Sequence, residues 1–158
     1  MKVLYTKTQK IIEFITALVI IFTILDIISS WSMIPDKIPT HFNFYGEANG
    51  WGSKNSIIIM PIIEVIIYIS LTLISQFPAI WNTPVKVTED NYIEVYQDTR
   101  SLLCYTKLSV LIIFSYTIII SARGIEISSW FIPITLLLTF GTIIYFVIKM
   151  VRCEIKRK

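Results

Sequence analysis

Four long apolar stretches constrain the fold of this chain more than any other feature. They cover residues 11–33, 56–77, 102–122 and 130–151, and each reaches the length of about 20 helical residues that crosses a bilayer. Several are rich in β-branched residues, which favour strands in water, but backbone groups inside a bilayer must hydrogen-bond to one another. The alternating pattern of a membrane barrel does not occur. We therefore predict an all-α, integral-membrane four-helix bundle in which residues 1–158 form one domain.

The overall composition supports this fold class and limits the kinds of partner that we expect. Hydrophobic residues make up 54% of the chain and charged residues 16%, which excludes an ordinary water-soluble domain and a disordered chain. A net charge of +3 is too small to indicate a nucleic-acid partner, so the lipid bilayer is the main partner that we expect. Cys104 and Cys153 do not have the spacing of a zinc site, and we expect neither a metal nor a cofactor.

Basic residues are concentrated on one side of the four predicted spans. Only Lys37, Lys54 and Arg123, of the 14 Lys and Arg residues, fall on the side that holds the first and third loops. Lys and Arg accumulate in the cytoplasmic loops of membrane proteins. We therefore expect both termini in the cytoplasm and residues 34–55 on the outer face of the membrane.

This outer loop has the most distinctive sequence in the chain. It contains two of the six prolines and three of the five glycines, and Pro35 and Pro39 prevent a helix directly after the first span. Asn49-Gly50 is a strong turn dipeptide. We predict a short extended arm followed by a tight turn at this dipeptide, with Phe42, Phe44 and Trp51 against the membrane surface.

The loop also resembles a known family. Residues 34–43 read IPDKIPTHFN and residues 49–54 read NGWGSK, with Gly46 between them. This pattern is similar to the signature of the bacterial membrane domain of unknown function 1648 (DUF1648), which also forms the N-terminal part of SdpI-type immunity proteins. Ala48 stands where the family usually has proline, and the further C-terminal membrane domain of SdpI is not found here. The matching positions are Pro35, Asp36, Ile38, Pro39, His41, Phe42, Asn43, Gly46, Gly50, Trp51, Ser53 and Lys54.

The resemblance implies a multi-pass protein of the bacterial plasma membrane, of envelope or immunity type. It makes the polar, glycine, proline and tryptophan positions of the motif candidates for contact with an extracellular ligand. These candidate binding residues are Pro35, Asp36, Pro39, His41, Asn43, Gly46, Gly50, Trp51 and Lys54.

Two acidic residues inside the predicted spans are further candidates. Asp26 and Glu64 lie about 10 Å and about 12 Å from the outer ends of their helices, and carboxylates at such a depth are costly. One interpretation joins them with His41, the only histidine, in a site that binds a metal ion or relays protons. The other is that both acids are protonated or bonded to hydroxyl groups, for which stripes of Ser, Thr and Tyr in the spans provide partners.

Two features on the inner side complete the prediction. Lys107 interrupts the third span, and we expect its side chain to reach the nearby membrane interface. Thr88, followed by Glu89 and Asp90, predicts the N-cap of a cytoplasmic helix that continues into the third span.

Three classes of function are compatible with a small membrane protein. We expect a non-enzymatic protein that binds or senses an extracellular ligand, such as a peptide toxin, through the outer loop; its partner is a secreted peptide, another membrane protein or a second copy. The alternative is a small ion- or proton-coupled transport component that uses Asp26 and Glu64. An enzyme is not expected, because no nucleophile–base pair, phosphate-binding loop or paired-metal motif is present.

Overall fold

Four long helices and one β-hairpin make up the described part of the chain. A computed structural model describes residues 3–155. The helices are α1 (Lys7–Ser30), α2 (Ile59–Ile74), α3 (Tyr92–Arg123) and α4 (Phe131–Ile155), and the strands are β1 (Lys37–Phe42) and β2 (Ala48–Ser53). Short 3₁₀ turns, η1 (Trp31–Met33), η2 (Lys54–Ile58) and η3 (Pro78–Ile80), join them.

The prediction of four membrane-spanning helices is confirmed. With their adjoining 3₁₀ turns, the four helical segments are each long and apolar enough to cross a membrane, and they cover Lys7–Met33, Lys54–Ile74, Tyr92–Arg123 and Phe131–Ile155. Apolar side chains on their outer surfaces, such as Leu137 and Ile28, stay exposed, as expected where lipid replaces water around a bundle.

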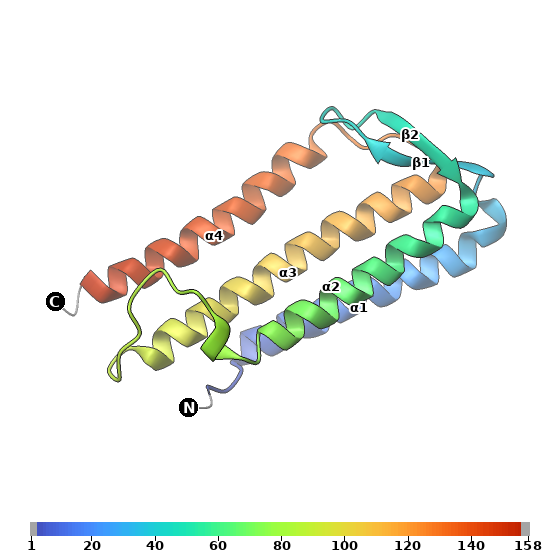
Figure 1. The fold of residues 1–158 in the computed structure, drawn as a ribbon. Coiled ribbons are helices and arrows are strands. Elements are labelled where there is room, and N and C mark those ends of the chain that lie inside the picture. Colours follow the sequence, from blue (N-terminus) through green and yellow to red (C-terminus); the bar gives the residue numbers. More distant parts are fainter. Residues whose placement is uncertain (1–2, 156–158) are drawn as a thin grey trace.

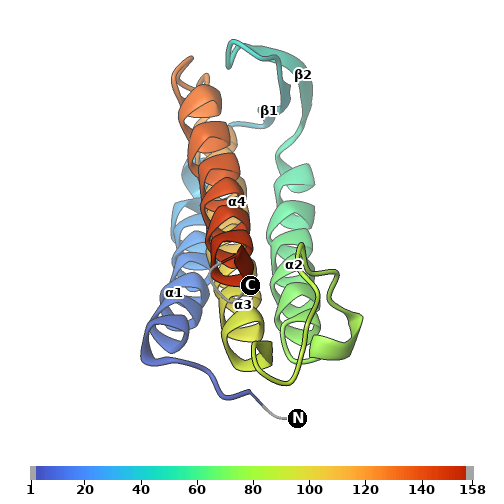
Figure 2. The same cartoon turned by 90° about the vertical axis from the view of Figure 1, so that its left-hand side faces the viewer.

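Helix α3 is the centre of the bundle. The other three helices all pack on α3, whereas α1 and α2 touch each other much less, and α4 lies along α3 on its own side (Figures 1 and 2). α3 also carries the largest group of buried residues, among them Arg100, Cys104, Lys107 and Ser115. Buried polar contacts between the helices therefore converge on this helix.

The two ends of the bundle differ in character. The hairpin covers one end, and α1 begins and α4 ends at the opposite end, here called the terminal end (Figure 1). A buried cluster of Ile27, Ile34, Ile38, Ile57, Ile118 and Ala122 joins the base of the hairpin to the helices. A second cluster, of Val85, Val95, Phe146 and Met150, packs the loop before α3 against α3 and α4.

The third helix begins later than Thr88, so the predicted N-cap is wrong. Asn91 is the N-cap of α3, and its side-chain oxygen accepts a hydrogen bond from the backbone N–H of Thr88 at 2.7 Å. Thr88 instead offers its carbonyl oxygen to the N–H groups of Asn91 and Tyr92. The predicted continuity is confirmed, because α3 runs without a break from Tyr92 to Arg123, about 48 Å at 1.5 Å per residue.

Candidate functional site

The turn of the hairpin is formed by residues 43–47, not by Asn49-Gly50 as predicted. The Asn43 side-chain oxygen accepts hydrogen bonds from the backbone N–H groups of Tyr45 and Glu47, at 2.9 and 3.0 Å. Gly46 has a φ of +87°, which a residue with a side chain rarely adopts. Asn49 and Gly50 lie within β2, where Gly50 pairs with His41 of β1. The local turn signal at Asn49-Gly50 was therefore overridden by the Asn43 turn and by contacts of Gly46.

Gly46 also fastens the hairpin to the loop between α3 and α4. Its carbonyl oxygen accepts a hydrogen bond from the Ile127 N–H at 2.9 Å. A Cβ atom at position 46 would lie 2.1 Å from the Ile127 carbonyl oxygen, so no side chain fits there. The tip of the hairpin is consequently held at two points, by its own base and by this loop.

The proline part of the motif forms the base of the hairpin. Pro39 is fully buried beside Ile38, which is 1% exposed. The Asp36 carbonyl oxygen accepts a hydrogen bond from the Lys54 N–H at 2.9 Å, and Pro35 lies against Gly124 at the end of α3. These motif residues therefore hold the hairpin on the helices.

Other residues of the hairpin form an accessible surface. His41 and Asn49 are both exposed and bond to each other, with 2.5 Å between His41 Nδ1 and Asn49 Oδ1. Trp51 is 50% exposed, and the Lys37 ammonium lies 5.9 Å from the centre of its ring. Phe44 and Tyr45 at the tip are more than 60% exposed. The predicted packing of Phe42, Phe44 and Trp51 on a membrane surface stays a prediction.

The structure does not bring Asp26, Glu64 and His41 together. No group of three His, Cys, Asp or Glu side chains within residues 3–155 could hold a metal ion. Asp26 pairs with Arg123 at the end of α3, at 3.2 Å. Glu64 is fully buried, and its Oε1 accepts a hydrogen bond from the Ser115 hydroxyl of α3. The structure agrees with the second interpretation for Glu64, one oxygen of which is bonded to a hydroxyl group, whereas Asp26 is paired with an arginine, which neither interpretation anticipated.

A buried ion pair lies nearer the terminal end. The Lys107 ammonium of α3 is 1% exposed and contacts both carboxylate oxygens of Glu13 on α1, at 2.7 and 2.5 Å. It also donates to the Thr72 hydroxyl of α2 at 2.7 Å and lies 4.8 Å from the centre of the Tyr68 ring. The expectation that Lys107 reaches the interface is therefore wrong, because Glu13, Thr72 and Tyr68 surround the ammonium inside the bundle.

Sequence reasoning missed this pair because it passed over Glu13. The first predicted span contains the acidic Glu13 and the third contains the basic Lys107. Because an unpaired charge inside a bundle is costly, these opposite charges could have predicted the pair. The Ser, Thr and Tyr side chains of the spans bond between helices at some positions and within one helix at others. Thr72 bonds to another helix as expected, whereas Thr16 and Thr23 donate to carbonyl oxygens of their own helix.

Arg100 ties the segment before α1 to the terminal end. This 3%-exposed side chain of α3 donates to the Val3 carbonyl at 2.6 Å and to the Ser75 carbonyl at 3.2 Å. Its guanidinium lies 4.5 Å from the centre of the Tyr5 ring. The Tyr5 hydroxyl is 2.6 Å from Ser75 Oγ, and burial raises the pKa of Tyr5.

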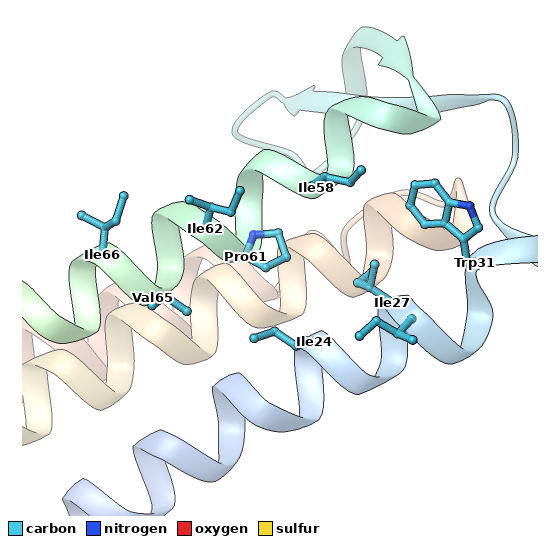
Figure 3. A pocket seen from close by; sticks show the side chains of 9 residues that line it. Ile24, Ile27, Trp31, Ile58, Pro61, Ile62, Val65 and Ile66 are labelled. Carbon is cyan, nitrogen blue, oxygen red and sulfur yellow. The ribbon is translucent and has the colours of Figure 1, made fainter.

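An apolar groove of about 740 Å³ separates α1 from α2 below the hairpin. Figure 3 shows Ile24, Ile27 and Trp31 of the first segment along one side of this groove and Ile58, Pro61 and Ile62 of the second along the other. The Lys54 ammonium lies 4.7 Å from the centre of the Trp31 ring. The groove exists because α1 and α2 pack mainly on α3 and touch each other much less.

Comparison with known protein families finds one match. The sequence model of one protein family, the domain of unknown function DUF1648, matches residues 17–65. This segment runs from within α1 through the hairpin to the first turns of α2. Over these residues the chain is similar to the DUF1648 family. The confirmed resemblance concerns this segment, which contains every candidate binding residue named from the sequence.

Part of the chain is also similar to a relative of unassigned function. An uncharacterized protein of Archaeoglobus fulgidus is 33% identical over 63 aligned positions, which cover 35% of this chain and 34% of that protein. The chain thus spans about a third of that relative's length. No solved structure matches the chain significantly.

The DUF1648 segment depends on α3, which lies outside the matched residues. Asp26 pairs with Arg123, and Glu64 bonds to Ser115. The hairpin tip rests on Ile127, just after α3. In this chain the second half therefore supplies partners for the polar groups of the DUF1648 segment.

Proposed function

We propose that this chain is a multi-pass protein of the bacterial plasma membrane that binds an extracellular peptide, such as a peptide toxin, through its hairpin. The observation that carries the proposal is a hairpin with a buried base and an exposed aromatic surface. Ile38 at the base is 1% exposed, whereas Phe44, Tyr45 and Trp51 are 63%, 69% and 50% exposed. Aromatic rings on a fixed scaffold provide contact area at little entropic cost.

The sheet of the hairpin supports a peptide as the ligand. It has only two strands among the described residues, so each strand has one edge without a neighbouring strand, to which a peptide strand could add. His41, Asn49 and Lys37 place polar groups beside Trp51. The asymmetric distribution of Lys and Arg supports an outward hairpin with both termini in the cytoplasm.

A protection assay tests this function. The chain is expressed in a bacterium sensitive to an SdpI-type secreted peptide toxin, beside Trp51→Ala and His41→Ala at equal membrane abundance. We expect the wild type to protect and both variants to lose most of the protection, because they remove exposed contacts without touching the buried base of the hairpin.

The control is Trp130→Ala, since Trp130 is 71% exposed near the same end but outside the hairpin. This variant is expected to protect like the wild type. Equal survival of all variants, or no protection by the wild type, would contradict the proposal for this class of toxin.

A second candidate function, proton-coupled transport, is favoured by Glu64 alone. Glu64 is fully buried, and its Oε2 has no hydrogen-bond partner within residues 3–155. Such a carboxyl group is a candidate proton carrier, whereas Asp26 is paired with Arg123. We expect a transporter to lose pH-driven flux in proteoliposomes on Glu64→Gln and to keep it on Asp26→Asn. Unchanged flux in Glu64→Gln would exclude this role.

A further inference from the structure

A second cavity lies at the terminal end of the bundle, between α3, α4 and the start of α1. Its volume is about 670 Å³, within the usual range of small-molecule sites. We call it the α3–α4 pocket. Its lining includes Asp98 and Tyr105 of α3 and Leu137, Leu138, Gly141 and Lys149 of α4.

The lining of the α3–α4 pocket changes from polar to apolar along the helices. Lys149, close to the end of α4, and Asp98, in the first turns of α3, mark the polar end. Leu137 and Leu138, about 18 Å from Lys149 along α4, mark the apolar end. A pocket that is polar at the membrane boundary and apolar towards the middle matches a lipid with its headgroup at the boundary.

The polar end carries one charge of each sign. Lys149 Nζ lies 2.6 Å from Asp98 Oδ1. Asp98 is 5% exposed, and its other oxygen, Oδ2, has no hydrogen-bond partner within residues 3–155. An unpartnered carboxylate oxygen at such burial is costly. Asp98 lines the pocket, so rotation of its carboxylate would bring this buried oxygen to a bound ammonium group. Lys149, with three donors, keeps N–H groups for a phosphate.

We propose that the α3–α4 pocket binds a zwitterionic aminophospholipid, with the ammonium of the headgroup on Asp98 and the phosphate on Lys149. Glu94 lies near enough to Lys149 to interact with it electrostatically. An anionic lipid without an ammonium group would therefore be repelled by the acidic residues at this end. A trimethylated headgroup fits less well, because it has no N–H to donate to Asp98 Oδ2. The acyl chain lies along Leu137, Leu138 and Tyr105.

Gly141 gives a way to close the pocket without disturbing the ion pair. A Cβ atom at this position would meet no atom within 4 Å. A leucine there would extend into the pocket, and replacing glycine inside a helix favours the helix. Gly141→Leu is therefore expected to fold, and any loss of lipid binding reports on the pocket.

The test is lipid binding to the purified full chain by native mass spectrometry. Phosphatidylethanolamine, phosphatidylcholine and phosphatidylglycerol with identical acyl chains are compared. We expect phosphatidylethanolamine to bind about tenfold more tightly than the other two, the effect of about one charged hydrogen bond. Gly141→Leu should abolish this preference, and Asp98→Asn should make phosphatidylethanolamine and phosphatidylcholine equivalent.

The control is Thr135→Leu, which adds the same side chain to α4 outside the pocket; the Thr135 hydroxyl donates to carbonyl oxygens of its own helix. It should bind lipids like the wild type. Equal affinity for the three headgroups, or a preference that survives Gly141→Leu, would overturn the proposal. Displacement of the lipid by soluble phosphoethanolamine at equal concentration would also overturn it, because the chain-binding half of the pocket would then contribute nothing.

Discussion

At the scale of single residues, buried charges distinguish this bundle from a simple membrane anchor. Lys107 is 1% exposed and Glu13 only 17% exposed, and the two side chains neutralise each other between α1 and α3. Removing one member of a buried pair is costly, because the other remains as an uncompensated charge. Arg123, by contrast, is 54% exposed, and exposed pairs contribute little.

We therefore expect Lys107→Met to lower the free energy of unfolding by about 3 kcal/mol or more, measured by denaturation in detergent micelles. The double variant Glu13→Gln, Lys107→Met should recover part of this loss, since it leaves no charge behind. Arg123→Gln serves as the control and should cost less than about 1 kcal/mol. A stable Lys107→Met variant would contradict the burial of this pair.

At the scale of elements, the hairpin is held from two sides. Its base is buried among helix ends, and its tip meets the loop after α3 through Gly46 and Ile127. The DUF1648 motif therefore combines residues of two kinds: Pro39 and Gly46 place the hairpin, whereas His41 and Trp51 are exposed on it.

Gly46→Ala is expected to separate the hairpin tip from the loop, because the new Cβ would collide with the Ile127 carbonyl and a φ of +87° disfavours alanine. We expect a loss of about 1–3 kcal/mol in stability and faster proteolysis within residues 43–47, followed by mass spectrometry. Gly141→Ala is the matched control, since its Cβ meets open space; it should be neutral or slightly stabilising. Equal behaviour of the two variants would refute the close approach at Gly46.

At the scale of the whole molecule, α3 organises the bundle. It receives Glu13 from α1, Thr72 and Glu64 from α2 and Lys149 from α4, each through a polar contact. Because the other helices pack mainly on α3, an apolar groove lies between α1 and α2. The α3–α4 pocket is a separate cavity at the terminal end. α1 begins and α4 ends opposite the hairpin (Figure 1), and the cytoplasmic location of the termini stays a prediction from the basic residues.

The sequence by itself determined the features that depend on local patterns. The length of the apolar stretches predicts four spanning helices because a bilayer sets the length of a helix, and the motif between Pro35 and Lys54 identifies the DUF1648 segment. Only the tertiary structure decided which distant residues meet. Lys107 and Glu13 are far apart in the chain, and their contact depends on how α1 and α3 are rotated against each other. The position of the turn at 43–47 also depends on a distant contact, because Gly46 lies against Ile127. The local turn preference of Asn49-Gly50 carries no information about that contact.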